Sequence, residues 1–401
     1  MRLKIAVISS GILPVPAVLG GAVENLIDFY LEYNNKHKLH DITVYSIYNR
    51  KVKKHPAQKS IVNHYKYINI NSIWFKVRAK IFERKSRPTY YYYQMEYFLE
   101  LIIKKIKKTT YDLIILENRP GFAIRLSEEF SIPIITHIHT NLLYNPSEEN
   151  LKVMAAMRGF IVVSEFIKKE IQKIGIPKDI KVVYNGLDAE VFNPQLATPI
   201  NREELGFTKE DFVAVFWGRL IPEKGIKELL LAFEKIKEHK SIKLLVIGSI
   251  NFEDESNSTN DFLDELQTIA NKLNGIVSFT GFIPYKEIPH YLATADVAII
   301  PSHINEAFGM TCIEACAMGM PVIATNDGGI PETLIGQKHI LLKKEEDLPT
   351  QIANAILTIK NNYSEYKGNN LPPHFNKEYY SQSFFENLYT LLSRDPAEML
   401  K

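Results

Sequence analysis

Cysteine is scarce in this chain, and its scarcity excludes a disulfide scaffold. The 401 residues include two cysteines, Cys312 and Cys316. Four positions apart, they would lie on one face of a helix. A metal or redox pair is an alternative there, but the neighbouring Met and Ala residues favour packing in a hydrophobic core. We therefore expect both side chains to be buried without a disulfide bond.

Long hydrophobic runs are absent as well. No stretch approaches the roughly 18 apolar residues that a membrane-spanning helix requires. The N-terminal run MRLKIAVISS is soon followed by Gly11 and two prolines, so it lacks the longer apolar region of a signal peptide. With 46% apolar and 23% charged residues, the composition is ordinary for a globular protein. We expect a cytoplasmic protein that is long enough for two domains.

A strong net charge is also lacking, but the two halves of the chain differ. The formal net charge is +2. Residues 1–185 hold 29 Lys and Arg against 16 Asp and Glu, a net charge of +13, whereas residues 186–401 hold 19 against 30, a net charge of −11. The two halves are therefore expected to attract different ligands.

Short apolar runs alternate with helical patterns along both halves. The first half has strand-like runs at 4–10, 42–48, 112–117, 133–139 and 159–164, with helical patterns at 22–33, 94–108 and 165–174. After a strand and an Asn-Gly turn within 180–194, strand-like runs follow at 212–220, 243–249, 277–282, 296–302 and 321–325, with helical patterns at 225–238, 261–273 and 286–293. This alternation is typical of α/β domains with parallel, doubly wound sheets. A last amphipathic run at 379–393 must dock on a domain that has already folded.

Two glutamates stand eight residues apart in the stretch NEAFGMTCIEACAMGMPVIATNDGG, at 305–329. Glu306 follows a strand-like run, so it should lie in a loop at the carboxyl end of that strand. Glu314 should lie one turn into the next helix. Ligands of open α/β sheets bind at this edge. Backbone N–H groups at the start of the same helix suit an anion, and they belong to Phe308, Gly309, Met310 and Thr311.

A Gly-Gly turn in LGGAVE, at 19–24, leads straight into the first helical pattern. Backbone amides at Gly21 could approach an anion closely, with the helix dipole favouring negative charge. A plain turn is the alternative interpretation. The pattern Gly-x-Gly-x-x-Gly is missing here, which argues against a dinucleotide such as NAD.

Basic and imidazole side chains occur at two other strand ends. In GRLIPEKG, at 218–225, Arg219 and Lys224 would suit a diphosphate, although such a pair by itself is usually a surface feature. In THIHTN, His137 and His139 should point to the same face of a strand, where an imidazole could bind a sugar hydroxyl or a polarised carbonyl. Zinc is not expected, because no third and fourth ligand stands at suitable spacing.

The order and spacing of these motifs resemble the retaining glycosyltransferases of family four, over nearly the whole chain. The matching segments are GGAVE, HIHT, YNGLD, GRLIPEKG, the Glu-x7-Glu stretch and GGIPE. The resemblance implies the GT-B fold, with two Rossmann-like, doubly wound domains facing a central cleft and a C-terminal helix that crosses back to the first domain. Residues 1–185 with 376–401 would form the acceptor side, and residues 186–375 would bind the nucleotide sugar.

The resemblance also implies roles for single residues. Glu306 would hydrogen-bond hydroxyls of the donor sugar, and Glu314 would bind the ribose hydroxyls. Arg219 and Lys224 would neutralise the diphosphate. His139, which matches the family histidine better than His137, would contact the sugar. Backbone groups and the base-binding loop would complete the donor site, at Gly21, Phe282, Ile283, Phe308, Gly309, Met310 and Thr311.

The implied reaction moves a sugar from a nucleotide, with UDP expected, to an acceptor hydroxyl with retention at the anomeric carbon. The acceptor would be a glycan or a lipid-linked molecule of the cell surface, and no nucleic acid is expected as a partner. No cofactor or metal is expected, because Asp-x-Asp is missing and two cations can supply the positive charge. A nucleotide-sugar-modifying enzyme, such as an epimerase, and a non-catalytic sugar-nucleotide-binding protein are alternatives. Nucleotide release that requires an acceptor would select the transferase.

A basic segment at 74–87 holds six basic residues and one acidic residue. On a helix, Trp74, Val77 and Ile81 would share one face, and four lysines follow at 104–108. One interpretation is a helix that packs this apolar face on the sheet with a solvated basic rim. The other is a surface that lies on an anionic bilayer, which would place the protein at the inner face of the cell membrane.

Overall fold

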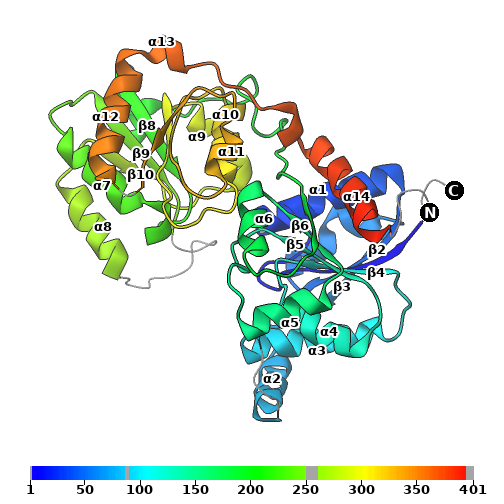
Figure 1. Ribbon diagram of the computed structural model, residues 1–401. Coiled ribbons are helices and arrows are strands. Elements are labelled where there is room, and N and C mark those ends of the chain that lie inside the picture. The colour runs from blue at the N-terminus through cyan, green and yellow to red at the C-terminus, as the bar shows by residue number, and fades with distance from the viewer. Residues whose placement is uncertain (1, 86–89, 250–260, 345, 394–401) are drawn as a thin grey trace. The chain divides into compact units, whose positions relative to one another are not determined.

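The computed structural model describes residues 2–85, 90–249, 261–344 and 346–393 (Figure 1). They form two compact units, one of residues 1–186 with 377–401 and the other of residues 187–376. Each unit has one parallel sheet with helices on both of its faces. The α/β, doubly wound class predicted from the sequence is therefore confirmed for both halves of the chain.

The sheet of unit 1 has seven parallel strands in the order β3-β2-β1-β4-β5-β6-β7. Its central strands are runs of Val, Ile and Leu that are buried on both faces, as parallel sheets require. The strands are β1 (Lys4–Ile8), β2 (Asp41–Ile47), β3 (Asn63–Ile68), β4 (Leu113–Glu117), β5 (Ile134–Ile138), β6 (Gly159–Val162) and β7 (Asp179–Val182).

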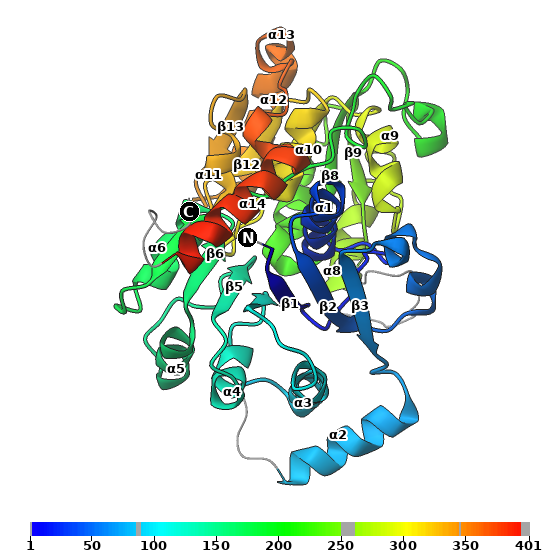
Figure 2. The same ribbon diagram turned by 90° about the vertical axis from the view of Figure 1, so that its right-hand side faces the viewer.

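Helices cover both faces of this sheet (Figures 1 and 2). They are α1 (Ala22–His37), α2 (Ile73–Lys85), α3 (Tyr93–Ile106), α4 (Phe122–Glu129), α5 (Glu148–Ala156), α6 (Glu165–Gln172) and α14 (Lys377–Leu392), with short turns η1 (Arg50–Lys54) and η2 (Pro56–Lys59). The C-terminal helix α14 packs on α1, and the rings of Tyr30 and Phe384 stack with centroids 4.4 Å apart. Buried Tyr380, Leu388 and Leu391 extend this contact. The apolar face of the last helix is thus covered by unit 1.

Unit 2 has a six-stranded parallel sheet in the order β10-β9-β8-β11-β12-β13. The strands are β8 (Phe212–Trp217), β9 (Ile242–Ile247), β10 (Val277–Phe279), β11 (Val297–Ile300), β12 (Val322–Thr325) and β13 (His339–Leu342). The helices are α7 (Ile226–Lys235), α8 (Asp261–Asn271), α9 (Ile288–Leu292), α10 (Met310–Ala317), α11 (Ile330–Thr333), α12 (Leu348–Asn361) and α13 (Tyr363–Tyr366). Short turns are η3 (Arg202–Leu205), η4 (Pro222–Lys224), η5 (Tyr285–Glu287) and η6 (Pro373–Phe375). Apolar residues of α7, α8 and α12 form one core with the strands.

Several elements were not predicted from the sequence. The strands β3 and β13 lie at sheet edges. Polar side chains interrupt the apolar run of β3, and β13 is only four residues long, so the pattern of a buried strand is weak in both. The expectation for the cysteines is confirmed, because Cys312 and Cys316 are free thiols buried in α10.

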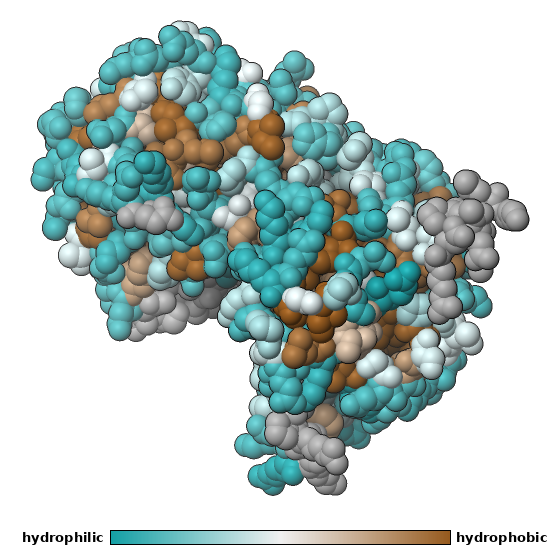
Figure 3. Space-filling view, in the orientation of Figure 1, coloured by the Kyte–Doolittle hydropathy of each residue, from teal (hydrophilic) through white to brown (hydrophobic). Residues whose placement is uncertain are grey.

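The helix α2 stands away from the sheet of unit 1. Both views place it beyond α3 (Figures 1 and 2). Phe75 and Phe82 contact Tyr97 of α3, with ring centroids 5.2 and 5.7 Å apart, and Ala79 is buried beside them. The helices in the described part of the chain include none with the length and apolar character of a membrane span. Hydrophilic residues separate the hydrophobic areas on the face drawn in Figure 3.

Candidate active site

The carboxyl edge of the unit 2 sheet brings two of the predicted residues into contact. Glu306 lies in the loop between β11 and α10, and Lys224 ends the short turn η4 after β8. The Lys224 ammonium and the Glu306 carboxylate form an ion pair, and both side chains are partly buried. A cation and a carboxylate therefore meet at the edge where ligands bind in this class of sheet.

The loop after β8 packs tightly against the loop after β11. Gly225 has a φ of +72°, and a Cβ there would overlap the carbonyl oxygen of Pro301. The backbone N–H of His303 donates to the carbonyl oxygen of Glu223 at 3.2 Å. Arg219 is exposed in the same loop, at the carboxyl end of β8. The sequence GRLIPEKG thus forms a loop that presents both predicted cations at this edge.

Asp327 and Lys344, which were not predicted from the sequence, hold the Glu306 loop in place. Asp327 follows β12 and is 1% exposed. Its Oδ2 accepts a hydrogen bond from the backbone N–H of Glu306 at 2.8 Å, and its Oδ1 accepts one from Lys344 at 2.6 Å. Gly328 has a φ of +56°, and a Cβ there would overlap the backbone of Glu306. The loops at 303–309 and 326–329 therefore form one rigid support for Glu306.

The start of α10 lies next to Glu306 in the chain. Gly309, with a φ of +105°, turns the backbone into the helix, which begins at Met310. The N–H groups of the first helical turn have no partner within the helix. Phe308, in front of this turn, is buried and contacts Phe375 with ring centroids 5.7 Å apart. The backbone at Met310 and Thr311 is thus placed as the sequence predicts for an anion site.

Glu314 lies one turn into α10, as predicted, but its side chain is 4% exposed. The indole N–H of Trp217, at the end of β8, donates to its Oε2 at 2.6 Å. Burial raises the pKa of Glu314 to about 7, although hydrogen bonds from Trp217 and Tyr285 oppose the shift. Neither partner was predicted from the sequence. A Trp at a strand end and a Tyr just after the loop of Phe282 and Ile283 were the available signals.

In unit 1, Gly21 caps α1 with a φ of +103°. A Cβ at Gly21 would overlap the carboxylate of Glu24, which is 4% exposed and accepts a hydrogen bond from the Ser10 hydroxyl at 3.1 Å. Burial raises the pKa of Glu24 to about 7. Glu24 was not predicted as a site residue from the sequence.

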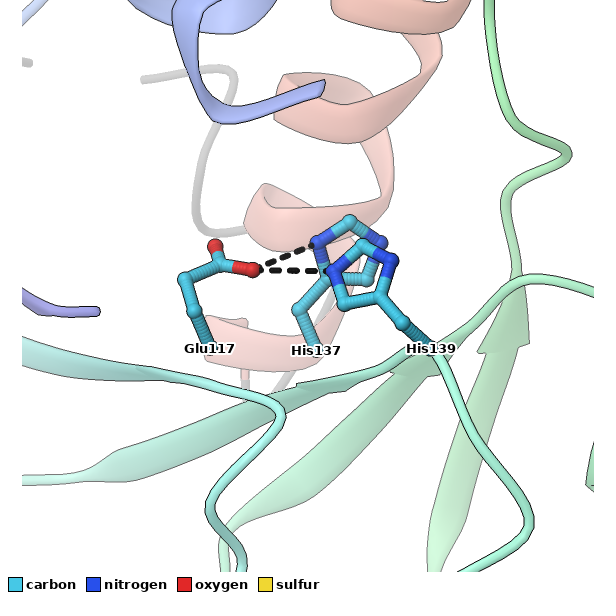
Figure 4. A group of neighbouring side chains, drawn as sticks. All are labelled: Glu117, His137 and His139. Atoms are coloured by element: carbon cyan, nitrogen blue, oxygen red, sulfur yellow. Dashed lines mark hydrogen bonds and ion pairs between the residues drawn. The ribbon is translucent and has the colours of Figure 1, made fainter. Parts of the chain in front are cut away.

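The two predicted histidines share a buried carboxylate, Glu117 (Figure 4). Glu117 ends β4 and pairs in register with His137 of β5. Its Oε2 lies 3.2 Å from Nδ1 of His137 and 3.0 Å from Nε2 of His139, and the Tyr30 hydroxyl donates to its Oε1 at 2.9 Å. Although burial alone would raise the pKa of Glu117, His137 and His139 hold it at about 2. The pKa of His139 is lowered to about 4 by burial and by His137.

This cluster contains a third metal-ligating side chain that was not predicted from the sequence. No third ligand was expected from the sequence, but Glu117, His137 and His139 offer ligand atoms within 4.8 Å of one another. Glu117 is 20 residues from His137 in the chain, so neither spacing nor a motif shows that adjacent strands bring them together. Among the residues that the structure describes, this is the one such group of His, Cys, Asp and Glu side chains.

Comparison with known families covers both units. The family "Glycosyl transferases group 1" matches residues 197–371, and "Glycosyltransferase Family 4" matches residues 40–191. These two segments hold nearly all the strands and loops described above. The chain is a group 1 glycosyltransferase. The family resemblance inferred from its motifs is thereby confirmed.

Similar proteins span most of this glycosyltransferase. The putative glycosyltransferase YtcC of Bacillus subtilis is 27% identical over 367 residues, 88% of this chain and 82% of YtcC. Spore coat protein SA of the same organism is 27% identical over 369 residues, 88% of this chain and 89% of that protein. The lipopolysaccharide 1,2-N-acetylglucosaminetransferase of Salmonella typhimurium is 25% identical over 65% of this chain and 66% of its own length.

Solved structures of the GT-B fold match the glycosyltransferase along nearly all of its length. HepE of Anabaena, crystallised with UDP and glucose, is 20% identical with a TM-score of 0.68, covering 97% of this chain and 100% of HepE. Sucrose-phosphate synthase of Thermosynechococcus elongatus is 19% identical with a TM-score of 0.71, covering 98% of this chain and 100% of the synthase. These likenesses establish the GT-B fold.

Proposed function

We propose that this glycosyltransferase moves a sugar from a UDP-linked donor to an acceptor hydroxyl, with retention at the anomeric carbon and without a metal ion. The observation that carries the proposal is the Lys224–Glu306 pair beside the start of α10. The two loops thus bring together a cation for phosphate, a carboxylate for sugar hydroxyls and the backbone N–H groups at the start of α10. The crystal structures of the neighbour HepE with UDP and with UDP-glucose support this choice of donor.

In the proposed mechanism, the diphosphate of the donor replaces Glu306 as the partner of Lys224. Lys224 and Arg219 then stabilise the negative charge that grows on the diphosphate as the glycosidic bond breaks. Glu306, released from the ion pair, accepts hydrogen bonds from the donor sugar. Because two side chains supply the positive charge, the reaction needs no metal. The acceptor oxygen bonds to the anomeric carbon on the face that the diphosphate leaves, and the proton of the acceptor hydroxyl passes to an oxygen of the departing diphosphate.

The nucleotide half of the donor is assigned to Glu314 and the loop after β10. Glu314 would bind the ribose hydroxyls, and the base would rest on Phe282 and Ile283, of which Phe282 is 37% exposed. Gly21 of unit 1 would add a backbone amide to the diphosphate, and His139 would contact the sugar. The acceptor, a glycan or a lipid-linked molecule, would bind to unit 1.

A screen of nucleotides by thermal shift tests the donor assignment. A ligand at about 100 times its dissociation constant adds roughly 2.7 kcal/mol to the free energy of unfolding. UDP and UDP-glucose should raise the melting temperature more than GDP or ADP does. Release of UDP should then require an acceptor, apart from slow transfer to water. Release of an altered nucleotide sugar without acceptor would instead identify a nucleotide-sugar-modifying enzyme.

Nucleotide-sugar binding should strengthen as the pH rises through about 7. Burial holds the pKa of Glu314 near this value, so the proton is lost as the pH rises and the carboxylate becomes a stronger acceptor for ribose hydroxyls. Titration of UDP-glucose by calorimetry between pH 6 and 8 measures this change. The variant Glu314→Gln, which cannot ionise, should bind weakly with no dependence on pH. A wild-type affinity that is flat across this range would contradict the role of Glu314.

We further propose that α2 lies on an anionic lipid bilayer. The helix exposes Ile73 (78%), Trp74 (74%), Val77 (47%) and Ile81 (48%), while a different face packs on α3. The sequence interpretation in which Trp74, Val77 and Ile81 pack on the sheet is therefore wrong. Exposed basic residues flank these apolar side chains, namely Lys76, Arg78, Lys80 and Arg84. Apolar side chains that enter the headgroup region, with a basic rim, favour an anionic membrane surface.

Flotation with vesicles tests this contact. Neutralising Lys76, Arg78, Lys80 and Arg84 together to Gln should lower binding to anionic vesicles at least tenfold, because each basic residue adds roughly 1 kcal/mol at such a surface. The sequence prediction also included Lys85 and Arg87, but Arg87 lies outside the described residues. A matched control replaces four exposed lysines of η1 and η2 instead, Lys51, Lys53, Lys54 and Lys59. Equal loss in the control, or equal binding to neutral vesicles, would argue against α2 as the contact.

A further inference from the structure

The proposed function gives His139 a contact with sugar but does not say which hydrogen-bonding group His139 presents. The imidazole has two nitrogens, and a neutral ring carries its proton on one of them. In Figure 4 the ring of His139 has one nitrogen directed at Glu117. Whether the other nitrogen carries a proton decides whether His139 donates a hydrogen bond to the sugar or accepts one from it.

Glu117 determines that state. Its carboxylate accepts a hydrogen bond from Tyr30 through Oε1, and Oε2 lies 3.0 Å from Nε2 of His139. Because Oε1 accepts from Tyr30 and Oε2 faces a ring nitrogen of each histidine, the carboxyl group is the acceptor in these contacts, in line with its lowered pKa, and Nε2 carries the hydrogen of this bond. Nδ1 of His139 then has a bare lone pair. Nδ1 is buried and has no hydrogen-bond partner among the residues that the structure describes.

We propose that Glu117 is a positioning residue that holds His139 in the Nε2–H form, so that Nδ1 accepts a hydrogen bond from a hydroxyl of the bound sugar. This inference rests on the proposed function, because it names the chemistry that His139 selects. A lone pair accepts from a hydroxyl but not from an ether oxygen or a methylene group. A buried acceptor left unpaired also penalises a sugar that lacks the hydroxyl.

A transition metal on the same three side chains is the competing explanation. A histidine bound to a metal normally donates its other ring N–H to a carboxylate, a carbonyl or water. Nε2 of His137 and Nδ1 of His139 are both buried without such a partner among the described residues. Two buried N–H groups without acceptors would be costly. The contacts therefore favour the hydrogen bond between His139 and Glu117 over a bound metal.

NMR of ¹⁵N-histidine-labelled protein tests the inference directly. At pH 7 the signal of His139, identified by its loss in His139→Asn, should show a protonated Nε2 and an unprotonated Nδ1. Its Nε2–H proton should be shifted downfield and protected from exchange with water. That proton should vanish in Glu117→Met and persist in Tyr30→Phe, which removes a different hydrogen bond to the same carboxylate. A protonated Nδ1, a doubly protonated ring, or stoichiometric zinc in the purified protein would overturn the proposal.

Binding measurements add a readout that a purely structural role of Glu117 would not produce. In Glu117→Met the affinity for UDP-glucose should fall about tenfold, the loss expected for one hydrogen bond, while the affinity for UDP stays within about twofold. Tyr30→Phe should leave the ratio of the two affinities unchanged. An equal loss for UDP and UDP-glucose would overturn the sugar contact. If wild type binds neither ligand, the proposed function fails, whereas the NMR result still decides the state of His139. The wild-type spectrum decides it even if Glu117→Met does not fold.

Discussion

Replacing Lys224 by alanine should lower the rate of sugar transfer at least a hundredfold and leave the free energy of unfolding nearly unchanged. The ammonium is placed to stabilise the charge of the leaving diphosphate, and the loss of one such contact costs roughly 3 kcal/mol of activation free energy. The fold should survive, because the side chains of Lys224 and Glu306 are 30% and 22% exposed. A partly exposed ion pair of this kind contributes about 1 kcal/mol or less to stability.

The measurement is the rate of UDP release with acceptor present, together with a thermal melt of each variant. Lys227→Ala is a matched control, because Lys227 lies three residues along the chain and pairs with Glu265 at the surface. The control should keep wild-type turnover. Arg219→Ala should show a loss similar to that of Lys224→Ala if both cations contact the diphosphate. Wild-type turnover in Lys224→Ala would remove Lys224 from the mechanism.

The second large effect is expected for Glu306. Glu306→Gln keeps the size of the side chain and one acceptor oxygen, but removes the negative charge beside the developing positive charge at the anomeric carbon. The turnover number should fall about a hundredfold, whereas the affinity for UDP should change little or rise, since Lys224 is freed from its partner. For Glu314→Gln we expect the opposite, with a weaker affinity for UDP and a smaller change in the turnover number.

Turnover and UDP binding measured on the same preparations separate the two glutamates. Glu223→Gln is the control for Glu306, because Glu223 is exposed in the neighbouring loop and contacts it through backbone atoms of His303. Loss of UDP binding in Glu306→Gln would require the two roles to be exchanged. Proton NMR of the product tests the stereochemistry separately, and an inverted anomeric linkage would contradict retention.

The sequence predicted the central strands because apolar runs such as KIAVI and DVAII are buried on both faces of a parallel sheet. It also placed Glu306, Glu314 and Lys224 at the carboxyl edge, since that position follows from strand ends alone. It could not predict that Lys224 and Glu306 would pair, because 82 residues separate them. The edge strands β3 and β13 were missed for a different reason, because β3 has a mixed polar pattern and β13 is only four residues long.

The partners of the site residues were the hardest features to predict. Asp327, Trp217, Tyr285 and Glu117 act through contacts between neighbouring strands and loops, and no local pattern records those contacts. Glu117 shows the limit clearly. In the sequence, Glu117 is one polar residue at the end of an apolar strand, as many strands have. Its contact with the histidines is seen only when β5 lies beside β4.

Calorimetric titration of UDP in the presence of EDTA tests the central claim most directly, namely that side chains at the edge of unit 2 bind the diphosphate without a metal. The account predicts one UDP bound per chain, with the same affinity when magnesium replaces EDTA, and binding at least tenfold weaker in Lys224→Ala. Binding that appears only with magnesium, or that is unchanged in Lys224→Ala, would contradict it.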